Sequence, residues 1–159
     1  MSDMEEKTNV MRIIEQRKIE YNSHDYSGTG AVSGIEVAEA LNENPENVFK
    51  TLVTVGKSGE HFVFVVPVNG ELDLKKAAKT VGEKKIEMIK SKDLLPLTGY
   101  VHGGCSPIGM KKSFKTIINE SAKDKEKIFF SAGKIGCQIE MKVEDLGKII
   151  NIKFADILE

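Results

Sequence analysis

The chain lacks several residue types and patterns that mark specialised protein classes. Among its 159 residues there is no tryptophan, and there are only four prolines and two cysteines, Cys105 and Cys137. Two cysteines cannot build a disulfide framework, and neither they nor the three histidines have the spacing of zinc ligands. No apolar run approaches the roughly 20 residues with which a helix crosses a bilayer. These absences argue against a disulfide-stapled domain, a zinc module and a membrane-spanning protein.

The beginning of the sequence has no recognisable targeting signal. Residues 1–6 are acidic on balance and have neither the basic nor the apolar region of a signal peptide. Hydrophobic residues make up 40% and charged residues 30% of the chain, which is ordinary for a soluble globular protein. We therefore expect one domain over residues 1–159, located in a reducing cytoplasm.

The charges are distributed unevenly, although the net charge is only −1. Residues 73–115 contain ten lysines and four acids, whereas the remainder has thirteen basic and twenty acidic residues. A local excess of lysine on an otherwise acidic chain is typical of a modest polyanion-binding face. A lysine-rich helix that is simply solvated would give the same pattern.

Short β-branched and alternating segments predict many strands. Residues 48–55 and 61–68 are joined by a turn with two glycines, which is the pattern of a hairpin. Lys50 lies near the start of the first strand, where it either points to solvent at an edge or projects into a site. Strands interleaved with short helices predict a mixed α/β (α+β) domain with a largely antiparallel, barrel-like sheet.

Helices are expected where the spacing or the capping residues favour them. Ser33 and Asp73 are suitable N-caps, and Glu36 completes a capping box with Ser33. Pro96 is expected to stop the fourth helix. The five expected helices cover residues 8–18, 35–41, 74–81, 91–95 and 145–150.

Residues 100–112 form a glycine-rich stretch whose residue types suit a small polar or phosphorylated ligand. Gly103 and Gly104 close an apparent strand, and Ser106 precedes a proline that stiffens the turn. Paired glycines allow another group to approach the main chain closely. The stretch lacks the spacing of a Walker loop or a dinucleotide fingerprint, so it is either a tight connection or part of a pocket. A second glycine-rich turn covers residues 131–136.

Four stretches taken together resemble the YbaK/EbsC family of aminoacyl-tRNA deacylases. They read FKTL (49–52), LDLKKAA (72–78), GYVHGGCSPIG (99–109) and KFADI (153–157). The resemblance implies an editing hydrolase that removes wrongly attached small amino acids from tRNA and is related to the insertion domain of bacterial prolyl-tRNA synthetases. It implies no metal and no redox cofactor.

The resemblance also implies roles for individual residues. Lys50 matches the functional lysine, and Gly103 and Gly104 match the glycine turn; these three are the expected catalytic residues. The expected substrate-binding residues are Tyr26, Thr51, Ser106, Ser131 and Lys134. From the local excess of lysine rather than from the resemblance, the expected tRNA-binding residues are Lys75, Lys76, Lys79, Lys84, Lys85, Lys111 and Lys112. Gln138 and Ser33 depart from some members, which carry an aspartate and an aromatic residue there.

The expected substrate is the 3′-terminal aminoacyl adenosine of a mischarged tRNA. Cys-tRNA(Pro) is the leading candidate. The resemblance further implies that a cysteine substrate's own thiol can assist the departure of the tRNA. Ala-tRNA(Pro) or a broad range of small amino acids is the nearest alternative. A non-catalytic module that binds a tRNA end or prolyl-tRNA synthetase is a different class, and His102 with Cys105 could instead form a nucleophile pair.

Overall fold

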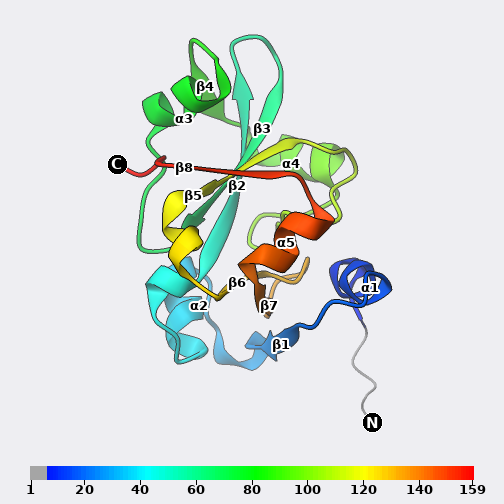
Figure 1. Cartoon of the computed structure of the whole chain (residues 1–159). Helices are drawn as coiled ribbons and strands as arrows, with labels where there is room; N and C mark the ends of the chain where they lie inside the picture. Colours follow the sequence, from blue (N-terminus) through cyan, green and yellow to red (C-terminus); the bar gives the residue numbers. More distant parts are fainter. Residues whose placement is uncertain (1–6) are drawn as a thin grey trace.

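The structure, a computed structural model, describes residues 7–159. Its helices are α1 (Asn9–Gln16), α2 (Gly34–Ala40), α3 (Leu74–Val81), α4 (Ser91–Thr98) and α5 (Val143–Ile149), arranged around the sheets as Figure 1 shows. Its strands are β1 (Asn22–Asp25), β2 (Phe49–Gly56), β3 (His61–Pro67), β4 (Ile86–Met88), β5 (Lys115–Asn119), β6 (Lys127–Ser131), β7 (Cys137–Lys142) and β8 (Ile152–Ala155). Short 3₁₀ turns cover Ser27–Thr29, Pro45–Asn47 and Glu120–Asp124.

The strands form two sheets. One has the order β4-β2-β3-β5-β8 and the other has the order β1-β7-β6. Within them β5 runs parallel to both β3 and β8, and the other pairings are antiparallel. The mixed α/β class is thus confirmed.

The expected barrel-like closure is not found in the described part of the chain, where neither sheet closes on itself. The two sheets are joined by one isolated bridge between Val48 and Phe129. Beyond this bridge β2 and β6 separate, since the edge of β2 next pairs with β4 at Thr54. A barrel would need a continuous ladder at this junction.

The central strand β3 is buried on both faces, which explains its unbroken run of apolar residues. Val63 and Val65 belong to the larger core cluster, which also takes residues from β6, β7 and α1. Phe62 and Phe64 face the opposite way, into a smaller cluster that α3 covers. The larger cluster therefore joins the two sheets, and the smaller one fastens α3 to the back of the five-stranded sheet.

Local sequence signals account for the hairpin and for two helix starts. Residues 49–67 form the predicted β2–β3 hairpin. Ser33 and Glu36 form the predicted capping box of α2, and the Asp73 side chain accepts hydrogen bonds from the first turn of α3.

Two local predictions are wrong. Helix α4 continues past Pro96 to Thr98, because the proline removes only its own N–H while Gly99 N still donates to Leu95 O at 2.9 Å. Residues 100–112 contain turns and no strand. Their shape comes from Tyr100, whose buried hydroxyl donates to Ile108 O at 2.5 Å.

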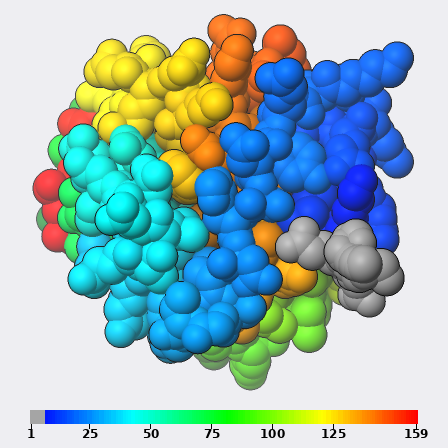
Figure 2. All heavy atoms as spheres, turned by 90° about the horizontal axis from the view of Figure 1, so that it is seen from below, coloured from blue at the N-terminus to red at the C-terminus, as the bar shows by residue number. Residues whose placement is uncertain are grey.

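The view from below shows the segment around β1 lying between the α2 region and α1 (Figure 2). Among residues 7–159, no helix has the length and the apolar character that crossing a bilayer requires.

Candidate functional site

A cavity of about 360 Å³ lies where the two sheets separate. β2 pairs with β3 along one edge. On its other edge, between the Val48 bridge and the start of β4 pairing at Thr54, no strand of the described chain pairs with β2. Loops and helix ends surround this free edge. The wall is formed by Tyr26, Val32, Ser33, Gly34, Val37, Val48, Phe49, Lys50, Thr51, Leu52, Val53, Val68, Met88, Ile89, Lys90, Ser91, Leu94, His102, Gly103, Cys105, Ser131 and Gln138.

The register of the hairpin determines which groups of β2 point into the cavity. Val48 O accepts a hydrogen bond from Val68 N, so the peptide groups of Val48, and of every second residue after it, face β3. The peptide N–H and C=O of Thr51 therefore point away from β3, toward the free edge. Side chains alternate between the faces of a sheet, so Lys50 and Thr51 reach the cavity from opposite faces of the strand.

Two buried side-chain oxygens in the cavity wall have no hydrogen-bond partner within residues 7–159. They are Thr51 Oγ1 and Gln138 Oε1, and the Gln138 residue is only 7% exposed. An unpaired buried acceptor costs about 1–3 kcal/mol, so in a native protein such an atom is usually satisfied by a ligand, an ion or a water molecule. Both atoms can accept a hydrogen bond from a polar ligand in the cavity.

Lys50 brings positive charge to the cavity. Its side chain is 30% exposed, and its Nζ lies 3.7 Å from Glu71 Oε1. The Glu71 side chain is 75% exposed, and exposed ion pairs are worth only about 0–1 kcal/mol. The ammonium group can therefore exchange this partner for a ligand at little cost.

Tyr26 and Ser131, two of the expected substrate-binding residues, also line the cavity. Tyr26 N donates to Gly136 O at 2.7 Å, which fastens the end of β1 to the second glycine-rich turn. Ser131 Oγ accepts a hydrogen bond from Gly133 N at 3.0 Å within the same turn.

The two glycines of the first turn have different surroundings. Gly103 has a φ of 88° and lines the cavity. Gly104 is buried outside the cavity wall, and a Cβ there would lie 3.1 Å from Ile135 N and 3.2 Å from two Lys134 main-chain atoms. The geometry thus relates Gly104 to the close packing of the two turns rather than to a positive φ or to space for a ligand.

Two expected substrate-binding residues do not reach the cavity. Ser106 is fully buried, and its Oγ accepts a hydrogen bond from Ile108 N at 3.3 Å, as in a turn that bonds its own backbone. Lys134 is exposed on the second turn and is not part of the wall.

His102 and Cys105 both line the cavity. Burial raises the pKa of the Cys105 thiol to about 12, so the thiol is protonated at neutral pH. A nucleophilic cysteine needs the thiolate form, and this environment opposes it.

Lys90 and Ser91 also line the cavity, although neither was among the site residues expected from the sequence. They stand at the start of α4 and form part of the wall. The signal was a lysine at the N-cap position, where an uncharged or acidic residue is usual.

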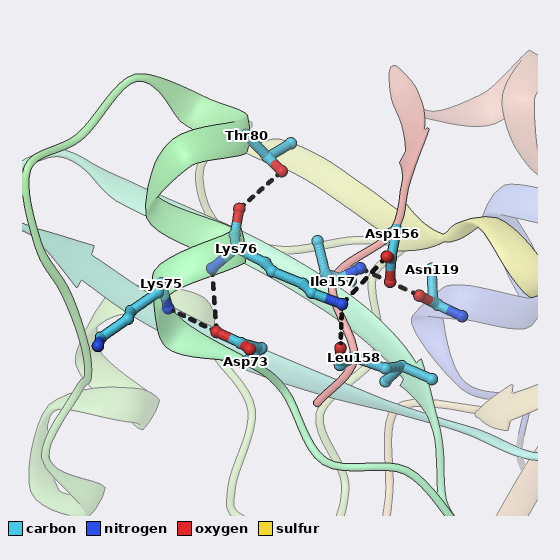
Figure 3. A network of polar contacts seen from close by, with 8 residues as sticks. All are labelled: Asp73, Lys75, Lys76, Thr80, Asn119, Asp156, Ile157 and Leu158. Atoms are coloured by element: carbon cyan, nitrogen blue, oxygen red, sulfur yellow. Dashed lines mark hydrogen bonds and ion pairs between the residues drawn. The ribbon is translucent and has the colours of Figure 1, made fainter.

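The seven expected tRNA-binding lysines are not equivalent. Lys76 Nζ lies 3.0 Å from Asp156 Oδ2 and donates to Leu158 O at 2.8 Å, which ties α3 to the C-terminal segment (Figure 3). Lys85 pairs with Glu87 at 3.0 Å. The others, Lys75, Lys79, Lys84, Lys111 and Lys112, are exposed, and none of the seven lines the cavity.

Comparison with known proteins gives a consistent family. Residues 30–149 match the aminoacyl-tRNA editing domain. A protein of Enterococcus faecalis, provisionally named Cys-tRNA(Pro)/Cys-tRNA(Cys) deacylase EbsC, is 47% identical over 154 residues, which are 96% of this chain and 94% of that protein.

Two crystal structures share the fold. A candidate trans-editing enzyme for prolyl tRNA synthetase superposes with a TM-score of 0.82 at 21% identity, over 96% of this chain and 98% of the other. A hypothetical protein superposes with a TM-score of 0.87 at 18% identity, over 96% and 100% of the two chains. The extent of the domain match and the identity to the Enterococcus protein confirm the predicted relationship: the chain belongs to the aminoacyl-tRNA editing domain family and is an aminoacyl-tRNA deacylase.

Proposed function

We propose that the chain acts in trans on mischarged tRNA and that its main substrate is Cys-tRNA(Pro). The observation that carries the proposal is the cavity itself, where the unpaired Thr51 Oγ1 and Gln138 Oε1 lie in the same wall as the Lys50 ammonium group. A cavity of about 360 Å³ is at the small end of the range for ligand sites, which suits a small amino acid at the end of a chain. The name of the Enterococcus relative supports cysteine as that amino acid.

The proposed chemistry depends on positioning rather than on a protein nucleophile. An aminoacyl ester is already activated, so holding it in place and stabilising the developing negative charge supply much of the rate. Lys50 provides positive charge beside the ester, and the Gly103 main chain lets the ester approach closely. Thr51 Oγ1 and Gln138 Oε1 accept hydrogen bonds from the α-ammonium group or from the substrate thiol.

A cysteine substrate can also take part in its own release. Its sulfur attacks the ester carbonyl carbon, the bond from that carbon to the ribose 3′ oxygen breaks, and the thiol proton ends on that oxygen. Water then opens the resulting thiolactone to free cysteine. The buried, protonated Cys105 has no role in this sequence.

The test is to incubate purified full-length protein with Cys-tRNA(Pro), Ala-tRNA(Pro) and Pro-tRNA(Pro). We expect rapid release of cysteine, slower release of alanine and no release of proline. Ser-tRNA(Pro) is a close analogue of Cys-tRNA(Pro) without sulfur, and we expect it to be hydrolysed more slowly than Cys-tRNA(Pro). Equal rates with cysteine, alanine and serine would refute the thiol-assisted step and favour a broad small-residue deacylase.

We further propose that the exposed lysines of α3 and of the segments beside it hold the tRNA body, and that prolyl-tRNA synthetase is a partner. The description of one structural relative as a candidate trans-editing enzyme for that synthetase supports this partner. Of the lysine set, Lys75, Lys79, Lys84 and Lys112 have no side-chain partner within the described residues. Binding should therefore weaken with salt. For each phosphate contacted, the logarithm of the binding constant should fall by about 0.7–0.9 for every tenfold increase in salt concentration.

A further inference from the structure

Helix α4 begins with a residue of the wrong charge for its position. Lys90 is the N-cap, and its side chain caps no backbone N–H within the described chain. The N-terminus of a helix carries partial positive charge and favours Ser, Thr, Asp or Asn at this position. Asp93 in the first turn offsets part of the charge, but it lies outside the cavity wall. The cavity therefore meets a helix end whose positive charge is increased by a lysine.

The first turn of α4 also has backbone donors to spare. Asp93 N donates to Lys90 O at 2.9 Å, whereas the amides of Ser91 and Lys92 have no acceptor within residues 7–159. Free N–H groups at a helix N-terminus form a natural receptor for an anionic oxygen. Lys90 and Ser91 both form part of the cavity wall, so an anion bound there would lie inside the site.

An independent feature of the same cavity indicates a ligand. Gln138 is more than nine-tenths buried, and its Oε1 has no partner in the described chain although it lines the cavity. The wall thus combines neutral acceptors, Thr51 Oγ1 and Gln138 Oε1, with the cationic Lys50 and Lys90. A ligand that suits this wall has hydrogen-bond donors in one part and a negative charge in another.

We propose that Lys90 and the first-turn N–H groups of α4, together with Lys50, bind the phosphate that joins the last two nucleotides of the tRNA 3′ end. This inference rests on the proposed function. In a 3′-aminoacyl adenosine only the ribose separates the 5′ phosphate from the aminoacyl ester, so one small cavity can hold both groups. Lys90 is then a binding residue that places the ester beside Thr51 and Gln138.

The experiment compares adenosine 5′-monophosphate with adenosine by calorimetric titration of the full chain at low salt. We expect the wild type to bind the monophosphate about tenfold more tightly, the gain that a charge-assisted contact typically gives. Lys90→Asp should abolish this preference. Because aspartate is a favoured N-cap, the same variant should melt at an equal or higher temperature, so lost binding cannot reflect lost folding.

Lys57→Asp is the matched control, since it makes the same charge change at an exposed residue of the β2–β3 turn, outside the cavity wall. It should lower the affinity for the monophosphate by less than about threefold, the loss expected from long-range charge alone. The backbone amide resonances of Ser91 and Lys92 should shift with the monophosphate and not with adenosine. The inference is overturned if the wild type binds both compounds equally, or if the two variants lose affinity to the same extent.

The proposed substrate and the proposed phosphate site can be refuted independently. A protein that prefers the monophosphate but does not deacylate Cys-tRNA(Pro) would refute only the proposed substrate. A protein that deacylates Cys-tRNA(Pro) without preferring the monophosphate would refute only the phosphate site.

Discussion

Substitutions of two threonines on β2, Thr51 and Thr54, distinguish an effect on substrate binding from an effect on stability. Thr51 Oγ1 is buried in the cavity wall without a partner in the described chain, whereas Thr54 Oγ1 donates to Phe62 O at 3.0 Å. Valine has nearly the same shape as threonine. Thr51→Val should therefore raise the free energy of unfolding by about 1 kcal/mol, because it removes an unsatisfied hydroxyl, and should lower deacylation.

Thr54→Val is the control for this prediction, and it should lower the free energy of unfolding by about 1 kcal/mol while deacylation stays the same. Urea unfolding and a deacylation assay on both variants check the pair. If Thr51→Val left the activity intact, its hydroxyl would have no part in substrate binding.

In the proposed chemistry, Lys50 is the residue that supplies the positive charge. Lys50→Ala should lower kcat/KM for deacylation about tenfold to a hundredfold, because one charge-assisted contact is lost in the transition state. Its melting temperature should change little, since the ion pair with Glu71 is exposed. Lys79→Ala, an exposed lysine on α3, should keep kcat with the isolated 3′-terminal aminoacyl adenosine as substrate. Equal kinetics of the two variants on that substrate would contradict the assignment.

At the scale of elements, the two glycine-rich turns behave as one unit. In Gly104→Ala the new methyl would meet backbone atoms of Lys134 and Ile135 at 3.1–3.2 Å, so one turn must shift. We expect a loss of about 1–3 kcal/mol in stability and reduced deacylation, because Ser131 moves with the second turn. Thermal unfolding and the deacylation assay measure the two effects.

Gly59→Ala tests whether the activity loss is specific to the turns. Gly59 has a φ of 91° in the β2–β3 hairpin, and a Cβ there meets nothing within 4 Å. Its replacement should strain the backbone and lower the melting temperature without lowering deacylation. A comparable activity loss in both variants would show that instability alone explains the Gly104 result.

The sequence predicted those elements whose signals are local. The β2–β3 hairpin and the α2 capping box depend on residues close together in the chain, and the structure confirms them. The end of α4 was missed because Pro96 is a strong local breaker, while Leu94 packs in the larger core cluster and Thr98 is buried at the end of the helix. Such tertiary contacts have no local signature.

The candidate site was predictable only where a residue's role is local or the family pattern identifies it. Lys50, Tyr26 and Ser131 could be placed in one pocket through the family resemblance, and the structure brings them to one cavity. The missing partner of Gln138 Oε1 could not be predicted, because the surroundings of a buried side chain depend on segments that are distant in the sequence. The burial of Ser106 depends in the same way on packing between distant segments.

At the scale of the whole molecule, stability should fall at alkaline pH. Burial raises the pKa of Cys105 from 9.0 and that of Tyr100 from 10.0, each to about 12. Between pH 9 and 12 the unfolded chain releases protons that the folded chain retains, so rising pH favours unfolding. The stabilising contribution is complete below pH 9 and is lost as the pH approaches 12.

Urea unfolding between pH 7 and 11 measures this dependence. Cys105→Ala should flatten the fall that begins near pH 9 and should keep most of the deacylase activity, since the thiol is protonated in the folded protein. Loss of activity in Cys105→Ala with unchanged stability would restore the nucleophile hypothesis.

The position of the C-terminal segment has a consequence for biosynthesis. Ile157 is fully buried in the cluster of Phe62 and Phe64, and Glu159 N donates to Glu71 O at 3.0 Å. A ribosome delivers residues 62–64 long before residue 157, so the nascent chain exposes the part of this cluster that Ile157 later covers. Chains in that condition are prone to aggregate and are the usual clients of chaperones. We therefore expect the growing polypeptide to need protection until Ile157, which follows β8, has emerged.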